Sequence, residues 1–393
     1  MVPEDWSFKS LDSAKIKVVD GDRGKEYPKA GDFLETGYCL FLSAKNVTKA
    51  GFLFEELQFI NEDKDKKLRK GRVERGNIVL TTRGSVGQFA YFDNSVPYDV
   101  MRINSGMVVI DPTQSELLPE FFYALCRSFI VGKQIEAASF GSAQPQLTVG
   151  IIKGIKLPIP PLPEQKKIAQ ILSTWDKAIT TTEQLLANSQ QQKKALMQQL
   201  LTGKKRLLDD NGVRFSGEWK RVELGQLLDY KQPTPYLVKS TNYSNDFKTP
   251  VLTAGKTFIL GYTDETDGVY DIDFPVVIFD DFTTACKFVD FPFKAKSSAL
   301  KILTAKPNVN IKYVFEAMQM LNFIIGGHQR HWISIFSNLV ISLPDKKEQQ
   351  KIAAVLTSAD QEIESLEQKI DALKQEKKAL MQQLLTGKRR VKP

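Results

Sequence analysis

The sequence has 393 residues, with 54 Lys and Arg against 46 Asp and Glu, a formal net charge of +8 and a pI near 9.1. This length accommodates two domains with connectors, and the basic balance favours a polyanionic partner, with nucleic acid the first candidate. No stretch approaches the ~20 apolar residues of a membrane span, the N-terminus lacks a secretory signal, and Cys39, Cys126 and Cys286 suit neither a disulfide framework nor a zinc site, so we expect a cytoplasmic protein.

The first globular region is expected to be a mixed α/β domain. Candidate strands lie at 76–82 and 107–110, and a candidate helix lies at 118–131. The loop 81–87 has glycines that permit close backbone approach to a phosphate, and the loop 141–148 holds glutamines whose amides can pair with adenine. The DNA contacts expected from this region are Lys45, Asn46, Arg83, Ser85, Gln144, Gln146 and Thr148.

A long helix is predicted over 161–206. Prolines precede it, and Gly203 near its end is a common C-terminal cap. Its seam positions alternate in steps of four and three residues, the heptad pattern of supercoiled helices, but Thr182, Ser189 and Lys193 place polar groups in the seam, so the helix needs a partner. The apolar seam residues are Leu172, Trp175, Ile179, Leu186 and Leu196.

The second globular region also reads as mixed α/β. Candidate strands lie at 274–279 and 299–303, and a candidate helix lies at 311–324. Its loops combine Lys, Arg, Thr and His, which suit phosphate and base contacts, although a structural or solvated role is the alternative for each residue. The DNA contacts expected here are Lys256, Thr257, Thr283, Thr284, Lys287, Lys294, Lys296, His328, Arg330 and His331.

A second long helix is predicted over 346–390, ending near Gly387. Its heptad seam contains Leu356, Ile363, Ile370, Leu373 and Leu380. Two matched seams in one chain favour pairing of the two helices with each other. The alternative is that each helix packs only on its own globular region.

The chain is a tandem repeat. Residues 164–206 and 348–390 align without a gap at an offset of 184, with 24 of 43 positions identical, and both copies contain KKALMQQLLTGK. Trp6 and Trp219 open the two copies. The domains expected are a recognition region over 1–160, a helix over 161–206, a second recognition region over 207–345 and a helix over 346–390.

No catalytic constellation emerges from the sequence. The segment 253–257 resembles the end of a phosphate-binding loop, but Pro250 occupies the place of its earlier glycine. Asp280 and Asp281 lack the Asp…Glu-x-Lys spacing of a nuclease, and His328 with His331 lack a third metal ligand. We therefore expect neither catalysis nor a metal site in this chain.

The sequence resembles the specificity subunits of type I restriction–modification systems along essentially its whole length. The most specific segments are the two helix starts around LPEQKKIA and KEQQKIAA and the doubled LMQQLLTGK ends. LTTRGSVGQFAYF in the first region, with TPVLTAGKTFILGY and IFDDFTTACKF in the second, also resemble family segments. The second helix start departs from the family pattern, because Lys346-Lys-Glu-Gln replaces the proline-rich run.

The resemblance implies an α+β fold with two α/β target-recognition domains separated by two long antiparallel coiled-coil helices, related by a pseudo-two-fold. Each domain would read one half of a bipartite target in double-stranded DNA, and the helices would set the gap. The implied partners are two modification subunits, which use S-adenosylmethionine, and restriction subunits, which use ATP and Mg²⁺. No cofactor is expected in this chain.

Two other functions stay open at the sequence level. One is a self-contained nuclease or methyltransferase with fused recognition domains, which the missing catalytic motifs disfavour. The other is a coiled-coil scaffold with no role in DNA binding.

Overall fold

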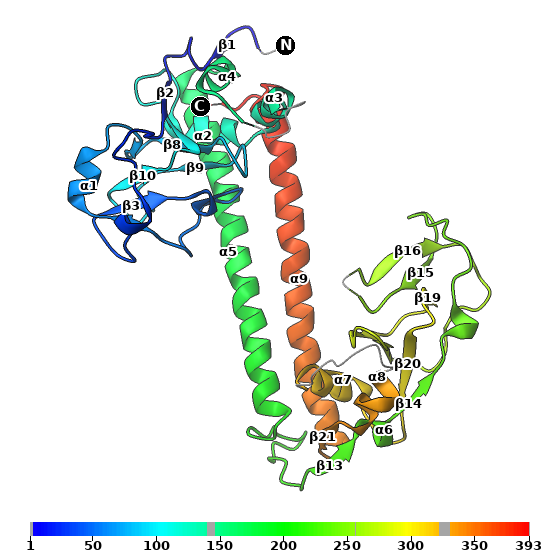
Figure 1. Cartoon of the computed structure of the whole chain (residues 1–393). Helices are drawn as coiled ribbons and strands as arrows, with labels where there is room; N and C mark the ends of the chain where they lie inside the picture. The colour runs from blue at the N-terminus through cyan, green and yellow to red at the C-terminus, as the bar shows by residue number, and fades with distance from the viewer. Residues whose placement is uncertain (1–2, 140–145, 256, 322–330, 393) are drawn as a thin grey trace. The chain divides into compact units, whose positions relative to one another are not determined.

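The structure is a computed structural model that describes residues 3–139, 146–255, 257–321 and 331–392. The chain divides into two compact units (Figure 1). The first unit consists of 1–182 and 369–393, and the second of 183–368. Each unit therefore contains one globular region and parts of both long helices, because helices α5 (Leu162–Leu200) and α9 (Lys346–Leu384) each contribute to both units.

The globular part of the first unit combines short strands with short helices. The strands are β1 (Ser7–Ser10), β2 (Lys17–Asp20), β3 (Cys39–Leu42), β4 (Val47–Thr48), β5 (Gly51–Phe52), β6 (Phe59–Ile60), β7 (Arg72–Val73), β8 (Ile78–Thr81), β9 (Phe89–Tyr91), β10 (Met101–Ile103), β11 (Met107–Asp111) and β12 (Lys156–Ile159). The helices are α1 (Glu62–Lys67), α2 (Pro119–Cys126), α3 (Phe129–Ser139) and α4 (Val149–Gly154). One antiparallel sheet has the order β2-β11-β8-β9, and a second has the order β6-β3-β10-β7 with β3 and β10 parallel.

The second unit repeats this topology with a different sequence. Its strands are β13 (Lys220–Glu223), β14 (Leu228–Lys231), β15 (Thr249–Leu252), β16 (Ile259–Thr263), β17 (Val276–Asp280), β18 (Cys286–Val289), β19 (Lys294–Ala295), β20 (Leu300–Ala305) and β21 (Val340–Leu343). Its short helices are α6 (Leu224–Leu227), α7 (Ile311–Gln319) and α8 (His331–Ser334). The sheet β14-β20-β17-β18 matches β2-β11-β8-β9, and β16-β15-β19, with β15 and β19 parallel, matches β6-β3-β10.

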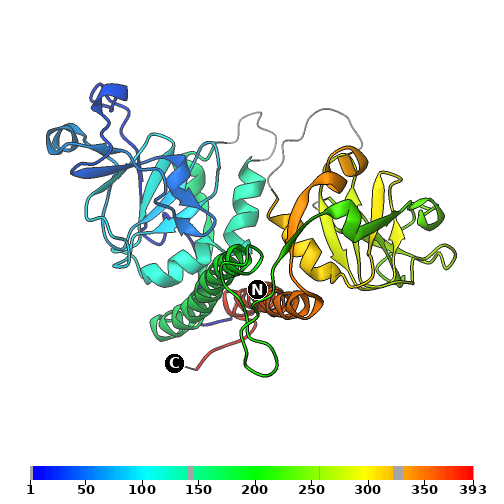
Figure 2. The same cartoon turned by 90° about the horizontal axis from the view of Figure 1, so that it is seen from below.

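Each unit attaches its globular part to a long helix in the same way. An antiparallel pair, β1 with β12 or β13 with β21, leads into α5 or α9. In the second unit α7 packs between the sheet and α9, since Val314 shares a core with Phe279 and Leu356. Figure 2 shows the strands of the second unit in yellow and green, with α7 in gold beside them.

The two long helices end in the same cap. Gly203 and Gly387 have φ of 72° and 70°, a left-handed conformation that glycine adopts without steric penalty. Lys205 N–H donates to the Gln199 carbonyl at 3.0 Å, and Arg389 N–H makes the matching bond at 3.1 Å. The glycine caps predicted from the sequence are confirmed.

The helices run antiparallel within each unit. In the first unit Ile168 and Leu172 share a core with Leu384, and Asp176 Oδ1 lies 2.5 Å from Lys377 Nζ. The expected seam positions face the packed side. Leu172, Ile179, Leu356 and Ile370 are buried, and Trp175, Leu186, Leu196, Ile363, Leu373 and Leu380 are half-buried.

In the second unit the same interhelical pair recurs with two more charges. Lys193 Nζ lies 2.6 Å from Asp360 Oδ1 and 3.1 Å from Glu316 Oε2, and Lys312 Nζ lies 2.7 Å from each acid. Burial alone would raise the pKa of Asp360, but hydrogen bonds from Lys193 and Lys312 lower it overall. The polar seam positions Lys193 and Lys377 are therefore occupied by ion pairs between the helices.

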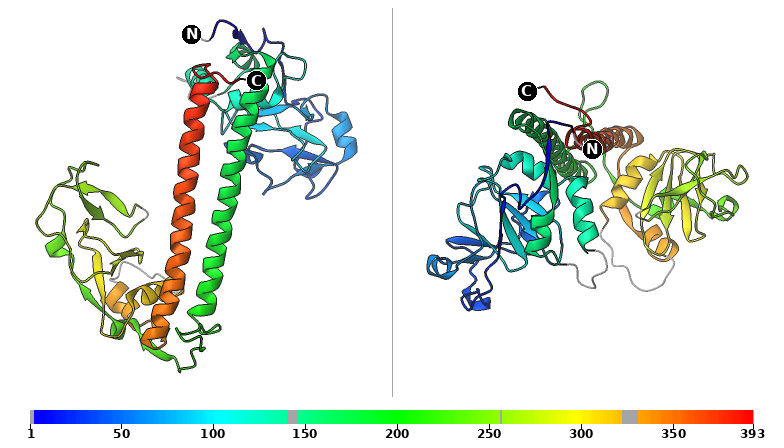
Figure 3. Two further views of the ribbon diagram at one scale, coloured as in Figure 1. Left: turned by 180° about the vertical axis from the view of Figure 1, so that it is seen from behind. Right: turned by 90° about the horizontal axis from the view of Figure 1, so that it is seen from above.

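Each helix start is held by a buried glutamate, which we call the helix-start clamp. Glu164 accepts from Trp6 Nε1 at 3.0 Å and from Arg390 Nε at 2.9 Å. Figure 3 shows both chain ends beside this part of the first unit. Glu164 begins the first aligned copy of the repeat, and Arg390 ends the second. The hydrogen bond between them raises the pKa of Arg390.

The second clamp has the same composition at the start of α9. Glu348 accepts from Trp219 Nε1 at 3.0 Å and from Arg206 Nε and Nη2 at 2.6 and 2.7 Å. The hydrogen bond to Glu348 raises the pKa of Arg206. In each unit, the arginine that follows one long helix binds the glutamate that begins the other.

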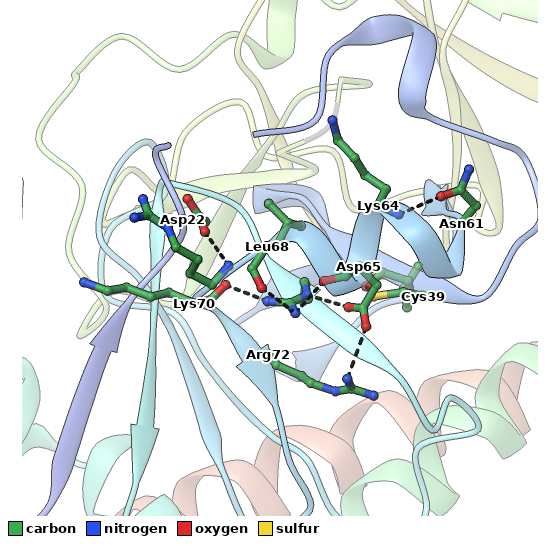
Figure 4. A network of polar contacts seen from close by, with 11 residues as sticks. Asp22, Cys39, Asn61, Lys64, Asp65, Leu68, Lys70 and Arg72 are labelled. Carbon is green, nitrogen blue, oxygen red and sulfur yellow. Dashed lines mark hydrogen bonds and ion pairs between the residues drawn. The ribbon is translucent and has the colours of Figure 1, made fainter. Parts of the chain in front are cut away.

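A buried polar network holds α1 against β10 in the first unit (Figure 4). The Asp65 carboxylate is 1% exposed and accepts from Arg102 Nε at 2.5 Å and from Arg72 Nη1 at 3.1 Å. Arg102 also donates to the carbonyls of Leu68 and Lys70. Burial beside Asp65 raises the pKa of the Cys39 thiol to about 12, so this cysteine stays a neutral core residue.

Two expected helices were wrong in extent. Residues 118–131 form two helices, α2 and α3, because the Ser128 hydroxyl donates to the Leu125 carbonyl and accepts from Ile130 N–H, which competes with helix continuation. The helix expected over 311–324 ends at Gln319.

Candidate nucleic-acid interface

In the first unit the β8–β9 turn and the segment before α4 lie together. Thr82 N–H donates to the Gly106 carbonyl at 2.8 Å, and Leu147 N–H donates to the Thr82 carbonyl at 3.1 Å. Thr82 and Leu147 are buried, while Arg83 and Gln146 beside them are exposed. The buried residues thus hold two exposed polar side chains on one surface.

Arg83 and Gln146, both expected DNA contacts, are in direct contact. With its amide oxygen turned toward the guanidinium, Gln146 accepts from Arg83 Nε at 3.2 Å and from Nη2 at 2.8 Å. A guanidinium has five N–H donors, so three remain for a phosphate or for a guanine edge. Gly84 and Gly87, with φ of 71° and 85°, form the turn that carries Arg83 and the exposed Ser85.

The β17–β18 turn of the second unit has the same backbone frame. Asp281 N–H donates to the Ala299 carbonyl at 3.0 Å, and His331 N–H donates to the Asp281 carbonyl at 3.1 Å. Asp281 and His331 therefore occupy the places of Thr82 and Leu147. By the same correspondence Phe282, which is 53% exposed, occupies the place of Arg83.

Four of the expected DNA contacts are buried, and these expectations need correction. Asn46 is 1% exposed and bonds the carbonyls of Leu53 and Glu56, so it closes a local loop. Lys294 is 1% exposed, and its ammonium lies 3.0 Å from Glu265 Oε2. His331 is 2% exposed, with Nδ1 2.7 Å from the Asp281 carbonyl oxygen. Each of these side chains binds a partner within the fold, and this could not be recognised from its place in a predicted loop.

Thr284 also serves the fold. It is 9% exposed, has a φ of 61°, and its hydroxyl donates to the Thr283 carbonyl. It shapes the β17–β18 turn, so its side chain is not presented to a ligand.

Several other candidates are accessible but already have partners. Lys45 is exposed and lies 2.5 Å from Glu56, a surface pair that is easily exchanged for another anion. Thr148 caps α4 by accepting from Ile151 N–H at 3.3 Å. Lys296 is half-buried, and its Nζ lies 3.1 Å from the Tyr243 hydroxyl.

Some of the remaining candidates are accessible, and the others lie outside the described residues. Thr257 and Thr283 are exposed, and Lys287 is half-buried on β18. Gln144, Lys256, His328 and Arg330 lie outside the described residues.

Comparison of the two repeat copies in sequence did not reveal the role of the identical glutamates and arginines that form the clamps. The clamp residues stood at the limits of the repeat, but their contact with each other was not predicted. The signal was present, since Glu164 and Glu348 are identical repeat positions, as are Arg206 and Arg390. Loss of the arginine would leave a buried glutamate without its charge partner, which is a physical reason for retaining both residues.

Over the four described ranges, no group of three or more His, Cys, Asp or Glu side chains is arranged to hold a metal ion. No helix in those same ranges is long and apolar enough to cross a bilayer.

Comparison with known proteins gives the class of this fold. The family model described as the type I restriction modification DNA specificity domain matches twice, over residues 3–188 and 216–375. A type I restriction enzyme specificity subunit from Escherichia coli is 48% identical over 156 residues, which cover 38% of this chain and 37% of that relative. A putative specificity subunit from Methanocaldococcus jannaschii is 25% identical over 100% of this chain and 95% of its own length.

Solved structures show the same fold. The crystal structure of the S subunit of a type I restriction–modification system from M. genitalium covers 97% of this chain and 96% of its own, with a TM-score of 0.66 at 14% identity. A chain from a structural study of assembly of the type I system matches over 98% of this chain, with a TM-score of 0.54 at 16% identity.

Because the two family matches together span most of the sequence, this chain belongs to the family of type I restriction–modification DNA specificity subunits. The resemblance seen in the sequence and the expected fold class are confirmed. Specificity subunits are non-catalytic recognition subunits, and the comparisons support neither the self-contained enzyme nor the scaffold without DNA.

Proposed function

We propose that each unit of this chain reads one half of a bipartite DNA target, and that the two long helices set the gap between the halves. The observation that carries this proposal is the pair of equivalent turns, β8–β9 and β17–β18, built on one backbone frame but presenting Arg83 in one unit and Phe282 in the other. Different exposed side chains on a shared frame suit two unlike half-sites.

The first unit supplies polar readout. Arg83 and Gln146 form one exposed surface, and their chemistry fits guanine and adenine edges or a phosphate. The net charge of +8 supports a further, sequence-independent attraction to the DNA backbone. The remaining described candidates for such contacts are Lys45, Ser85, Thr148, Thr257, Thr283, Lys287 and Lys296.

The repeated helix ends supply the surface for partner proteins. Gln198 and Gln199 are exposed on α5, and their repeat equivalents Gln382 and Gln383 are exposed on α9. Two matching surfaces suit two copies of one partner. We expect these copies to be modification subunits that methylate adenine with S-adenosylmethionine, joined by restriction subunits that use ATP and Mg²⁺, in the cytoplasm.

An exchange of one globular region tests the proposal. Residues 213–340 are replaced by the equivalent region of another family member, and methylated adenines are mapped genome-wide in cells that also express the modification subunit. We expect one half-site to change completely, while the other half-site and the gap stay the same. Exchange of 1–160 is the matched control and should change the opposite half-site. A change of both half-sites by either exchange would contradict the proposal.

A further inference from the structure

The β17–β18 turn is fixed by its own hydrogen bonds. Asp280 Oδ1 accepts from Phe282 N–H at 3.0 Å and from Thr283 N–H at 2.8 Å. Asp280 N–H donates to the Ala285 carbonyl at 2.8 Å, and Thr284 N–H donates to the Asp280 carbonyl at 2.9 Å. These bonds define the backbone of the tip without any contribution from the Phe282 ring.

The base of the turn is held from beneath by buried charge. Asp281 is 1% exposed, and its Oδ1 accepts from Trp332 N–H at 2.9 Å. Lys301, itself 2% exposed, places Nζ 3.4 Å from Asp281 Oδ2. Because Trp332 and Lys301 come from α8 and β20, the turn is anchored to two other elements of the unit.

Phe282 lies between this tip and this base, with 53% of its surface exposed. Isolated exposed apolar residues are ordinary, so the exposure alone carries no conclusion. The informative features are that a rigid turn presents the ring and that the ring occupies the place of Arg83. Because the backbone that carries the ring is already ordered, binding through this ring orders little more of the chain, which favours a recognition contact.

A phenyl ring offers no hydrogen bond to a base edge. The apolar feature that distinguishes bases in the major groove is the 5-methyl group of thymine, and Phe is among the side chains that contact it. We propose that Phe282 contacts a thymine 5-methyl group in the half-site read by the second unit. This inference rests on the proposed function and adds a base and an atom to it.

Uracil, which differs from thymine only in lacking this methyl group, provides the test. Once the target is mapped, duplexes are made with each thymine of that half-site replaced in turn by uracil, and methyl transfer by the assembled modification complex is measured. For the unmodified chain, uracil at one position should lower the rate at subsaturating DNA by about four-fold, the effect of one buried methyl group.

The Phe282→Ala variant should lower the rate on the thymine duplex and show no further loss with uracil at that position. Phe282→Leu should retain part of the preference for thymine. Phe8→Ala is the matched control, because Phe8 is 54% exposed but lies on β1 of the first unit. It should leave the preference unchanged.

Three results would overturn the inference. The first is a thymine preference that persists in Phe282→Ala. The second is weaker assembly of Phe282→Ala with the modification subunit by gel filtration, which would make the ring a protein contact. The third is equal rates of the unmodified chain on the thymine and uracil duplexes, together with a 2-aminopurine fluorescence enhancement that Phe282→Ala abolishes, which would indicate base stacking. In all three cases the region exchange would still change one half-site, whereas failure of the proposed function would abolish that result.

Discussion

The two units place the same residues at the helix starts and different residues at the turns that face solvent. Glu164 with Trp6 and Arg390 forms the same arrangement as Glu348 with Trp219 and Arg206. The shortest distance from each tryptophan Nε1 and arginine Nε to the carboxylate lies between 2.6 and 3.0 Å. A buried carboxylate needs its full set of donors, so a change in any partner is penalised. This requirement keeps the clamp alike in both copies.

The turns follow the opposite rule. The bonds that hold Thr82 and Asp281 in equivalent places join main-chain groups to Gly106 and Ala299, so they form whatever the side chains are. The neighbouring position is exposed in both units, where Arg83 or Phe282 disturbs no packing. Arg83 and Phe282 can therefore differ, because bonds between main-chain groups fix the turn on which each side chain is exposed.

Lengthening both helices should produce the largest change in behaviour. One heptad inserted after Leu186 and another after Ile370, which are repeat equivalents, adds about 10 Å to the pair at about 1.5 Å per residue. Mapped methylation should disappear from the original sites and move to sites with a gap about three base pairs longer, at about 3.4 Å per base pair. The half-site sequences should not change.

The added base pairs also rotate the duplex by about 100°, at about 10.5 base pairs per turn, so activity is expected to fall. The decisive measurement is therefore the gap in whichever sites remain methylated. A heptad added to one helix only is the control and should disrupt the seam. Residual sites with the original gap would show that something other than the repeated helices sets the spacing.

Breaking the clamp of the second unit should cause the next largest effect. Glu348→Ala removes an acceptor that is 1% exposed and leaves Arg206 and Trp219 without it, which should lower the free energy of unfolding by about 3 kcal/mol. Urea denaturation of the full chain measures the change. Glu348→Gln retains the size and one acceptor and should lose less. A loss below about 1 kcal/mol for the alanine variant would mean that the clamp is incidental.

Substitution by Met at two repeat-equivalent lysines, Lys193 and Lys377, should lower the free energy of unfolding by different amounts in the two units. Lys193→Met leaves Glu316, which is fully buried, and Asp360 to share Lys312, so a loss of about 2 kcal/mol is expected, less than the full penalty for an unpaired buried charge.

Lys377→Met should change stability by no more than about 0.5 kcal/mol, because Asp176 is 42% exposed and keeps Arg127 at 3.6 Å. Burial also lowers the pKa of Lys377 despite its bond to Asp176, so its charge is poorly accommodated. Equal losses in urea denaturation for the two variants would contradict the difference inferred from the two clusters.

The repeated part of the fold could be predicted from the sequence, and much of the recognition surface could not. Heptad spacing and Gly203 reveal helices because those signals are local. Lys294 and His331 look like loop residues available to DNA, yet distant partners, Glu265 and the Asp281 carbonyl, bury them. Polar side chains are the usual partners of base edges, so the sequence alone does not single out Phe282, whose proposed contact rests on its match to Arg83 in three dimensions.

A small effect is also expected from a circular permutant, which tests whether the two clamps are interchangeable. Arg390 Nη1 and Nη2 lie 2.9 and 2.6 Å from the Asp5 carboxylate oxygens, and Arg390 and Trp6 bind one glutamate, so the two chain ends are already adjacent. Arg206 and Trp219 are 13 positions apart. Direct fusion of the two ends would place Trp6 nine positions after Arg390. A linker of four Gly and Ser residues therefore makes the two connections equal in length. Opening the chain at Asp210 disrupts its exposed ion pair with Lys351 and local turn bonds such as Asp209 N–H to the Val213 carbonyl. Because these contacts lie on an exposed connection, the free energy of unfolding should change by less than about 1 kcal/mol. Methyl transfer with the modification subunit should continue on the same bipartite site. A permutant opened after Ile363, inside α9, interrupts the seam and should fail to fold. If opening at Asp210 is equally damaging, the two clamps are not equivalent, and the repeat is a similarity of sequence without interchangeable function.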